Sequence, residues 1–185
     1  MRKAMVVSQL RTSDVTDAAV IAAMADVARE DYVPAARRDT AYVDRPIPLG
    51  NGRMMNPPLA TGRLLTVAEI EPDDKVLLLG DVTGYCAALL GHMGLTPTVA
   101  EGPEGNPAGA PYDVIVIDGA VDHFPEALAD QLAEGGRVAL GLVRHGVTRL
   151  CSGRKAGGAL GFVSLHDMEM AVLPGFGAKK AAFVF

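Results

Sequence analysis

Residues 75–85 of the chain read KVLLLGDVTGY, and this stretch decides the fold. A short apolar run ended by a glycine is typical of a strand that is buried on both faces of a parallel sheet. A helical pattern follows directly, over residues 84–93. A buried strand, a glycine turn and a helix form the first half of a strand–helix–strand unit.

The same alternation continues toward the C-terminus. Further strands are predicted at 96–101, 112–118 and 137–143, with a helix at 125–133. Pro97 favours an edge position for the first of these strands. Because parallel strands need right-handed crossovers, the alternation predicts a mostly parallel sheet with helices on both faces.

Two further features complete the expected sheet. The connector at 102–111 is rich in glycine and proline and is too short to hold another helix and strand. Three apolar stretches at 147–151, 160–165 and 181–185 are separated by the glycine-rich segments 152–158 and 174–177. We interpret these three stretches as strands of an antiparallel edge.

The first 71 residues are expected to be helices and loops. Residues 1–31 read as two helices, with Asp17 as the N-cap of the second, and the proline-rich stretch 32–58 reads as surface loops. Asn56 is expected to cap a third helix. The prediction is one α/β domain over residues 1–185, with N-terminal helices and loops at 1–71 and the sheet core at 72–185.

Composition narrows the class of protein. The 185 residues are 49% hydrophobic and 21% charged, which is typical of a globular chain. A net charge of −5 without a dense Lys/Arg cluster argues against nucleic acid as a partner, and no apolar run is long enough for a membrane span. We therefore expect a soluble, cytoplasmic protein.

Cysteine and histidine usage predicts no metal site. Cys86 and Cys151 are far apart in the sequence and are interpreted as buried apolar residues, and the four histidines show no ligand spacing. Asp122 and His123 are interpreted as a solvated loop in which one of the two caps the next helix. A nicotinamide enzyme is disfavoured, because G-x-G-x-x-G does not follow the first strand.

Ligands of parallel sheets bind at the carboxyl ends of the strands. This rule places the loop 80–84, Glu101 and the segment 118–122, which begins with Asp118, along one rim of the predicted sheet. A functional site is expected there.

Short stretches in unbroken order from residue 7 to residue 140 resemble the protein-L-isoaspartate O-methyltransferases. They are VSQLR (7–11), VTDAAV (15–20), YVP (32–34), PIPLGNG (46–52), APYDVIV (110–116) and QLAEGGRV (131–138). The resemblance implies a Rossmann-like methyltransferase fold and S-adenosylmethionine as the cofactor. It also implies protein repair, by methyl transfer to the carboxylate of isoaspartyl residues in damaged proteins.

The resemblance also implies site residues. Gly80, Asp81 and Gly84 belong to the loop that matches the family's cofactor loop, and Glu101 matches the acid that takes the ribose hydroxyls. Asp118 follows the strongest strand, where the family usually has an uncharged residue; it is a further candidate for cofactor binding. Asn56 matches a serine near the reacting groups and is the candidate catalytic residue, although a structural role as helix cap is favoured.

Some positions depart from the family pattern. Leu78 replaces an acidic residue, Val82 replaces the central glycine of the loop, and the connector at 102–109 replaces a helix and a strand beside the adenine. These changes predict a shortened homologue in which isoaspartyl methylation is lost or impaired. Two alternatives stay open: an active methyltransferase on isoaspartyl or another carboxylate, and a non-catalytic module, a pseudoenzyme, that assembles as a homodimer.

Overall fold

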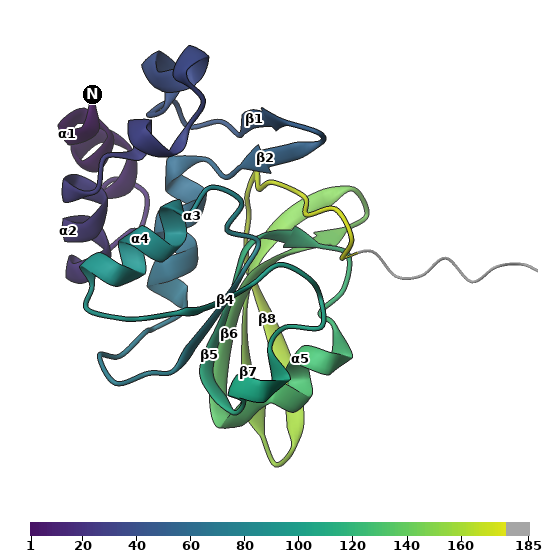
Figure 1. The fold of residues 1–185 in the computed structure, drawn as a ribbon. Coiled ribbons are helices and arrows are strands. Elements are labelled where there is room, and N and C mark those ends of the chain that lie inside the picture. The colour runs from purple at the N-terminus through teal and green to yellow at the C-terminus, as the bar shows by residue number, and fades with distance from the viewer. Residues whose placement is uncertain (177–185) are drawn as a thin grey trace, which may run out of the picture.

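A six-stranded sheet in the order β4-β3-β5-β6-β7-β8 forms the centre of the protein (Figure 1). The computed structural model describes residues 1–176. Strands β4, β3, β5 and β6 run parallel, and β6, β7 and β8 form an antiparallel meander. The predicted mostly parallel sheet with an antiparallel edge is confirmed. The strands are β3 (Val76–Leu79), β4 (Thr98–Ala100), β5 (Tyr112–Val121), β6 (Leu132–Arg144), β7 (Val147–Ala156) and β8 (Ala159–Asp167).

Strand β4 lies at the edge of the sheet and pairs with β3. The chain between β4 and β5 forms only one short 3-10 turn, η4 (Pro107–Gly109). The sheet therefore ends at β4, as the short connector predicts. The open edge leaves Val99 half exposed, at 52%.

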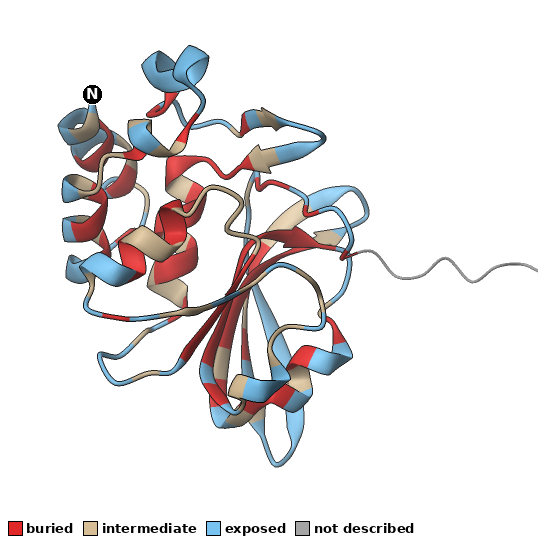
Figure 2. Ribbon diagram, viewed as in Figure 1, coloured by how far each residue is buried: buried red, intermediate tan, exposed pale blue. Residues whose placement is uncertain are grey.

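Helices cover both faces of the sheet (Figure 1). The N-terminal helices and α4 (Tyr85–His92) pack on one face, and α5 (Glu126–Gln131) packs on the other. Figure 2 shows the resulting band of buried residues along the central strands. The other elements are α1 (Arg2–Met5), the π-helical η1 (Val6–Leu10), α2 (Ala18–Asp26), η2 (Arg29–Tyr32), η3 (Ala35–Thr40), α3 (Pro58–Val67) and the hairpin of β1 (Ile47–Gly50) and β2 (Arg53–Met55).

The alternation of side chains along β3 divides the core in two. Val76 and Leu78 join the apolar cluster under the N-terminal helices and α4, whereas Leu77 and Leu79 join the cluster under α5. All four residues of β3 are buried. A polar side chain on this strand would be buried on either face, so polar groups gather where the strands end.

Two predicted strand boundaries are wrong: β6 begins at Leu132 and not at 137, and β7 ends at Ala156 and not at 151. Strand β7 continues through the glycine-rich segment to Ala156, and the turn falls at Gly157 and Gly158. Gly153 lies inside the strand, paired with Val138 and Phe162. The ring of Phe162 covers it, and a Cβ atom there would lie 2.7 Å from that ring, so the position requires glycine. The predicted strand at 181–185 lies outside the described residues.

Of the predicted helix caps, the one at α2 is confirmed and those at α3 and α5 are wrong. Asp17 caps α2, because its Oδ1 accepts hydrogen bonds from the amides of Ala19 (2.8 Å) and Val20 (3.0 Å). Helix α3 instead has Pro57 at its N-cap, and the side chain of Asn56 points elsewhere. Helix α5 starts after Pro125 without a side-chain cap, so the cap expected from Asp122 or His123 is wrong.

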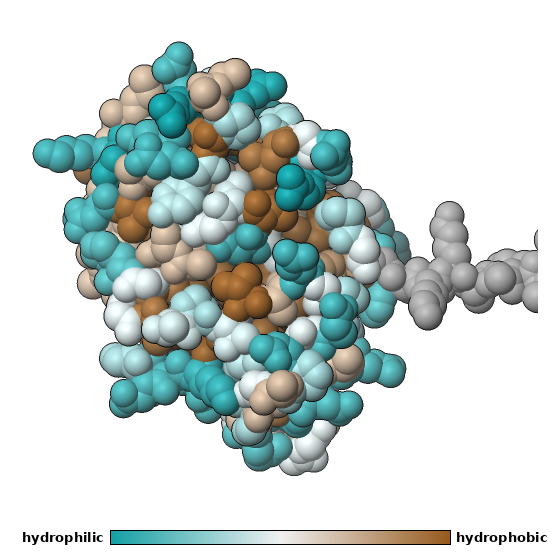
Figure 3. Space-filling model, in the orientation of Figure 1, coloured by the Kyte–Doolittle hydropathy of each residue, from teal (hydrophilic) through white to brown (hydrophobic). Residues whose placement is uncertain are grey.

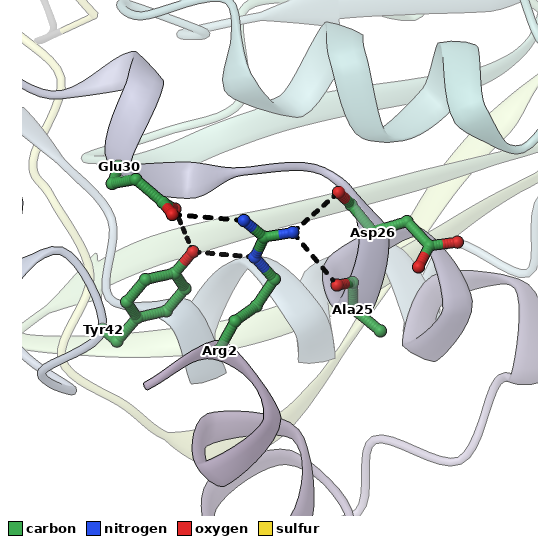
Figure 4. Close-up of polar contacts among 5 residues, drawn as sticks. All are labelled: Arg2, Ala25, Asp26, Glu30 and Tyr42. Carbon is green, nitrogen blue, oxygen red and sulfur yellow. Dashed lines mark hydrogen bonds and ion pairs between the residues drawn. The ribbon is translucent and has the colours of Figure 1, made fainter.

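Arg2 ties the first helix to the rest of the N-terminal region (Figure 4). Its guanidinium donates to the Tyr42 hydroxyl (2.9 Å), the Asp26 carbonyl (2.9 Å) and Glu30 Oε1 (3.1 Å). Tyr42 also donates to Glu30, and this hydrogen bond is the main reason that the pKa of Glu30 is lowered.

In residues 1–176, no helix is both long and apolar enough to cross a bilayer.

We expect Asp17→Ala to lower the free energy of unfolding by about 1 kcal/mol, because two amides at the start of α2 lose their acceptor. Urea denaturation monitored by circular dichroism measures this change. Asp39→Ala, which removes an exposed carboxylate outside that helix, is the matched control. Equal stability of the two variants would contradict the capping role.

Candidate functional site

The loop after β3 is a tight turn that leads into α4. Gly80 and Gly84 both have positive φ, +76° and +81°, a conformation that is strained for residues with a Cβ atom. The carboxylate of Asp81 accepts hydrogen bonds from the amides of Cys86 (3.2 Å) and Ala87 (2.8 Å). Asp81 thus satisfies free amides at the start of α4, while partial burial raises the pKa of its carboxyl.

A cavity of about 310 Å³ lies at the carboxyl ends of β3 and β4. Of the site residues expected from the sequence, Gly80, Asp81 and Glu101 line it. Asn56, Gly84 and Asp118 are not among the lining residues. The remaining wall residues are Arg53, Val82, Val99, Ala100, Leu173, Pro174 and Phe176.

Residues 168–176, which we name the C-terminal strap, form one wall of this cavity. The strap pairs with the end of β5: the Ala120 amide donates to the Ala171 carbonyl (2.7 Å), and the Leu173 amide donates to the Ala120 carbonyl (2.9 Å). The side chain of Leu173 lies over two glycines. A Cβ atom at Gly80 or Gly119 would lie 2.5 or 2.6 Å from Leu173, so this close approach requires glycine at both positions.

Sequence reasoning missed the strap. Its apolar residues next to Pro174 could be read as a short strand, but their partner on β5 is more than 50 residues away in the chain. Leu78, where the family pattern has an acid, is buried in the apolar cluster beneath α4 and does not line the cavity. Tyr85 and Cys86 are buried between α4 and the sheet, as predicted.

A buried polar cluster lies beside the cavity. Asn56 Nδ2 donates to Asp118 Oδ1 (2.7 Å), and Asn56 Oδ1 accepts from the Ala171 amide (2.7 Å). Arg29 donates to the backbone carbonyls of Asn56 and Ala41. The amide of Asn56 therefore joins β5 to the strap, which explains why it does not cap α3.

The charges of this cluster are strongly perturbed. Burial raises the pKa of Asp118 to about 7, and the nearby Asp81 carboxylate adds to the shift. The hydrogen bond from Asn56 and the positive charge of Arg29 oppose it. Arg29 is fully buried over the ring of Tyr85, 5.0 Å from its centroid, and burial lowers the pKa of its guanidinium.

The remaining polar candidates lie apart from the cavity. Asp122 and His123 are exposed, as expected of a solvated loop. Among the residues that the structure describes, no three His, Cys, Asp or Glu side chains gather in a way that could hold a metal ion. Figure 3 shows a mixed face of the molecule, with apolar side chains in its middle surrounded by hydrophilic ones.

The raised pKa of Asp118 predicts a pH-dependent stability. The carboxyl titrates near 3.8 in the unfolded chain and near 7 in the folded one. Between these values the folded state holds a proton that the unfolded state has lost, so stability falls as the pH rises. We expect Asp118→Asn, which cannot ionise, to gain up to about 4 kcal/mol relative to wild type over this window.

Urea denaturation of both proteins from about pH 4 to pH 8 measures the difference in unfolding free energy. The comparison removes most of the contribution of the other carboxyls. A difference that does not change with pH would show that Asp118 titrates normally.

Sequence comparisons with known proteins point to one family. The sequence model of the protein-L-isoaspartate(D-aspartate) O-methyltransferase family matches residues 1–99 and 92–162. The protein-L-isoaspartate O-methyltransferase of Koribacter versatilis is 36% identical over 94% of this chain and 90% of its own length. That of Gloeobacter violaceus is 35% identical over 72% of this chain and 78% of its own length.

Two solved structures share the fold. A protein-L-isoaspartate O-methyltransferase superposes with a TM-score of 0.78 at 20% identity, covering 96% of this chain and 67% of its own. A Plasmodium falciparum structure described as the same enzyme, in complex with S-adenosyl-L-homocysteine, gives 0.74 at 17% identity, covering 94% of this chain and 98% of its own. With the family match over most of its length and relatives above 30% identity, this chain belongs to the protein-L-isoaspartate O-methyltransferase family.

Proposed function

We propose that this chain binds S-adenosylmethionine in the cavity and transfers its methyl group to the carboxylate of isoaspartyl residues. The family is S-adenosylmethionine-dependent and acts on proteins that contain isoaspartate. The observation that carries the proposal is the position of the cavity, between the Gly80 turn and Glu101. This is where an open parallel sheet binds its ligand.

The cavity suits the cofactor in size and charge. Its volume of about 310 Å³ is at the lower end of the range of roughly 300–1,000 Å³ that is usual for small-molecule sites. Glu101 stands at the end of β4 as an acceptor for ribose hydroxyls. Asp81 and Glu101 also favour a cationic ligand, and the bound cofactor supplies a methyl group on a positively charged sulfur.

The protein's part in the reaction is alignment. A carboxylate is already a nucleophile, so the site has to orient it toward the methyl group and exclude water. Arg53, an exposed residue of β2 at the cavity, is the side chain we assign to attracting the anionic acceptor. The buried Leu173 and Phe176 of the strap exclude water from the opposite wall.

We further propose that turnover is impaired near neutral pH. Asn56, at the position of the family's serine, uses both polar atoms of its amide within the chain. Ionised Asp118 beside it adds a negative charge that opposes the approach of an acceptor carboxylate. A different observation, the half-exposed Val99 on the unpaired edge of β4, favours a second candidate function: a non-catalytic protein that presents this edge to a second copy.

We expect Glu101→Gln to weaken the binding of S-adenosylhomocysteine about tenfold, because a charged acceptor for the ribose becomes neutral. Isothermal titration calorimetry measures this affinity. Glu104→Gln, which changes an exposed carboxylate outside the cavity lining, is the matched control. Absence of binding by the wild-type chain would overturn the proposed function.

We expect Asp118→Asn to methylate an isoaspartyl peptide faster than wild type at about pH 8. The two rates should converge toward about pH 6, where Asp118 is protonated. Transfer of a radiolabelled methyl group to isoaspartyl and aspartyl forms of one peptide measures the rate. Cofactor binding without methyl transfer by either protein would instead support the non-catalytic candidate.

A further inference from the structure

We infer that Asn56 is a positioning residue: it clamps the C-terminal strap over the cavity and thereby sets the affinity for the cofactor without touching it. The identity of the ligand, the cofactor, rests on the proposed function. The clamp itself rests on three parts of the chain that are hydrogen-bonded to one buried residue, Asn56: two through its side chain and one through its backbone carbonyl.

The hydrogen bonds of Asn56 fix the orientation of its side chain. Asp118 Oδ1 accepts from the NH2 group, and the Ala171 amide donates to the carbonyl oxygen, each at 2.7 Å. Rotating the amide by half a turn would place oxygen against carboxylate and NH2 against N–H. An amide is needed here because only a side chain with a donor and an acceptor on separate atoms serves both partners.

The backbone of Asn56 is held as well. Buried Arg29 donates to its carbonyl and also to the carbonyl of Ala41, at 2.7 Å for the latter. The hydrogen bond from Arg29 therefore fixes the backbone from which the Asn56 side chain extends. The strap is attached to this side chain through the amide of Ala171.

The tether acts on the cavity wall two residues further along. Leu173 lies two residues after Ala171; its side chain covers Gly80 and lines the cavity together with Pro174 and Phe176. Asn56 is not among the residues that line the cavity. Without this hydrogen bond, the two backbone hydrogen bonds with Ala120 remain at this part of the strap. We therefore expect Leu173 to be held less firmly over Gly80, and the wall against which the ligand packs to be less ordered.

Amide hydrogen exchange tests the clamp without any ligand. We expect Asn56→Leu to raise the exchange rates of the Ala171 and Leu173 amides by about tenfold. The amide of Ile115 in the middle of β5 should stay protected. Asn56→Ser is the milder second variant: its hydroxyl is too short to bridge both partners, so the same amides should exchange faster.

Gln131→Leu is the matched control for this experiment. Gln131 is an equally buried carboxamide, but it holds the connector after β4 through the Asn106 amide (2.8 Å) and the Glu104 carbonyl (2.7 Å). Its loss should raise exchange at Asn106 and leave Ala171 unchanged. Unaltered exchange at Ala171 and Leu173 in both Asn56 variants, or a uniform rise through the sheet, would overturn the clamp.

Binding measurements test the consequence for the ligand. We expect Asn56→Leu and Leu173→Ala each to weaken S-adenosylhomocysteine binding about tenfold, and the double variant to be little weaker than either. Additive losses would show that Asn56 acts on the ligand by another route. If wild type binds no S-adenosylhomocysteine, the proposed function fails, and the exchange rates still decide whether Asn56 holds the strap.

Discussion

The double burial of β3 and β5 is the constraint on which the rest of the structure depends. Every residue of β3 is buried, and β5 is buried along all its length except at Asp113. A strand in this position has no wet face, so its polar groups must lie beyond its ends or find partners in the protein. Asp118, toward the carboxyl end of β5, finds such partners: it is buried and accepts hydrogen bonds from Asn56 and Thr61.

Burying Asp118 and Arg29 together carries a large desolvation cost, which only a well-connected network offsets. The network here is spread over four distant segments and is completed by one neutral amide, Asn56. Such a cluster resists piecemeal change, because removal of one member leaves another buried and unpaired. The cluster also explains how this site departs from the family pattern at Asn56 and Asp118: the two new side chains are hydrogen-bonded to each other.

The shortened sheet and the strap have opposite effects on the cavity. Ending the sheet at β4 opens one side, where Val99 is half exposed. The strap closes the other side, because Leu173 and Phe176 are buried against the end of the sheet. What remains is a pocket of about 310 Å³ with a polar turn at its base and an acidic residue at its rim. A ligand held there would contact mainly the Gly80 turn and the strap.

The sequence by itself determined the order of strands and helices, the edge position of β4 and the capping of α2, because each depends on neighbouring residues. It also brought Gly80, Asp81 and Glu101 to one cavity, since the carboxyl ends of adjacent parallel strands meet at one edge. Only the tertiary structure decided the role of Asn56, whose partners lie 62 and 115 residues away. The strap over Gly80 and the raised pKa of Asp118 are likewise products of long-range packing, because burial is a property of the folded chain and not of local sequence.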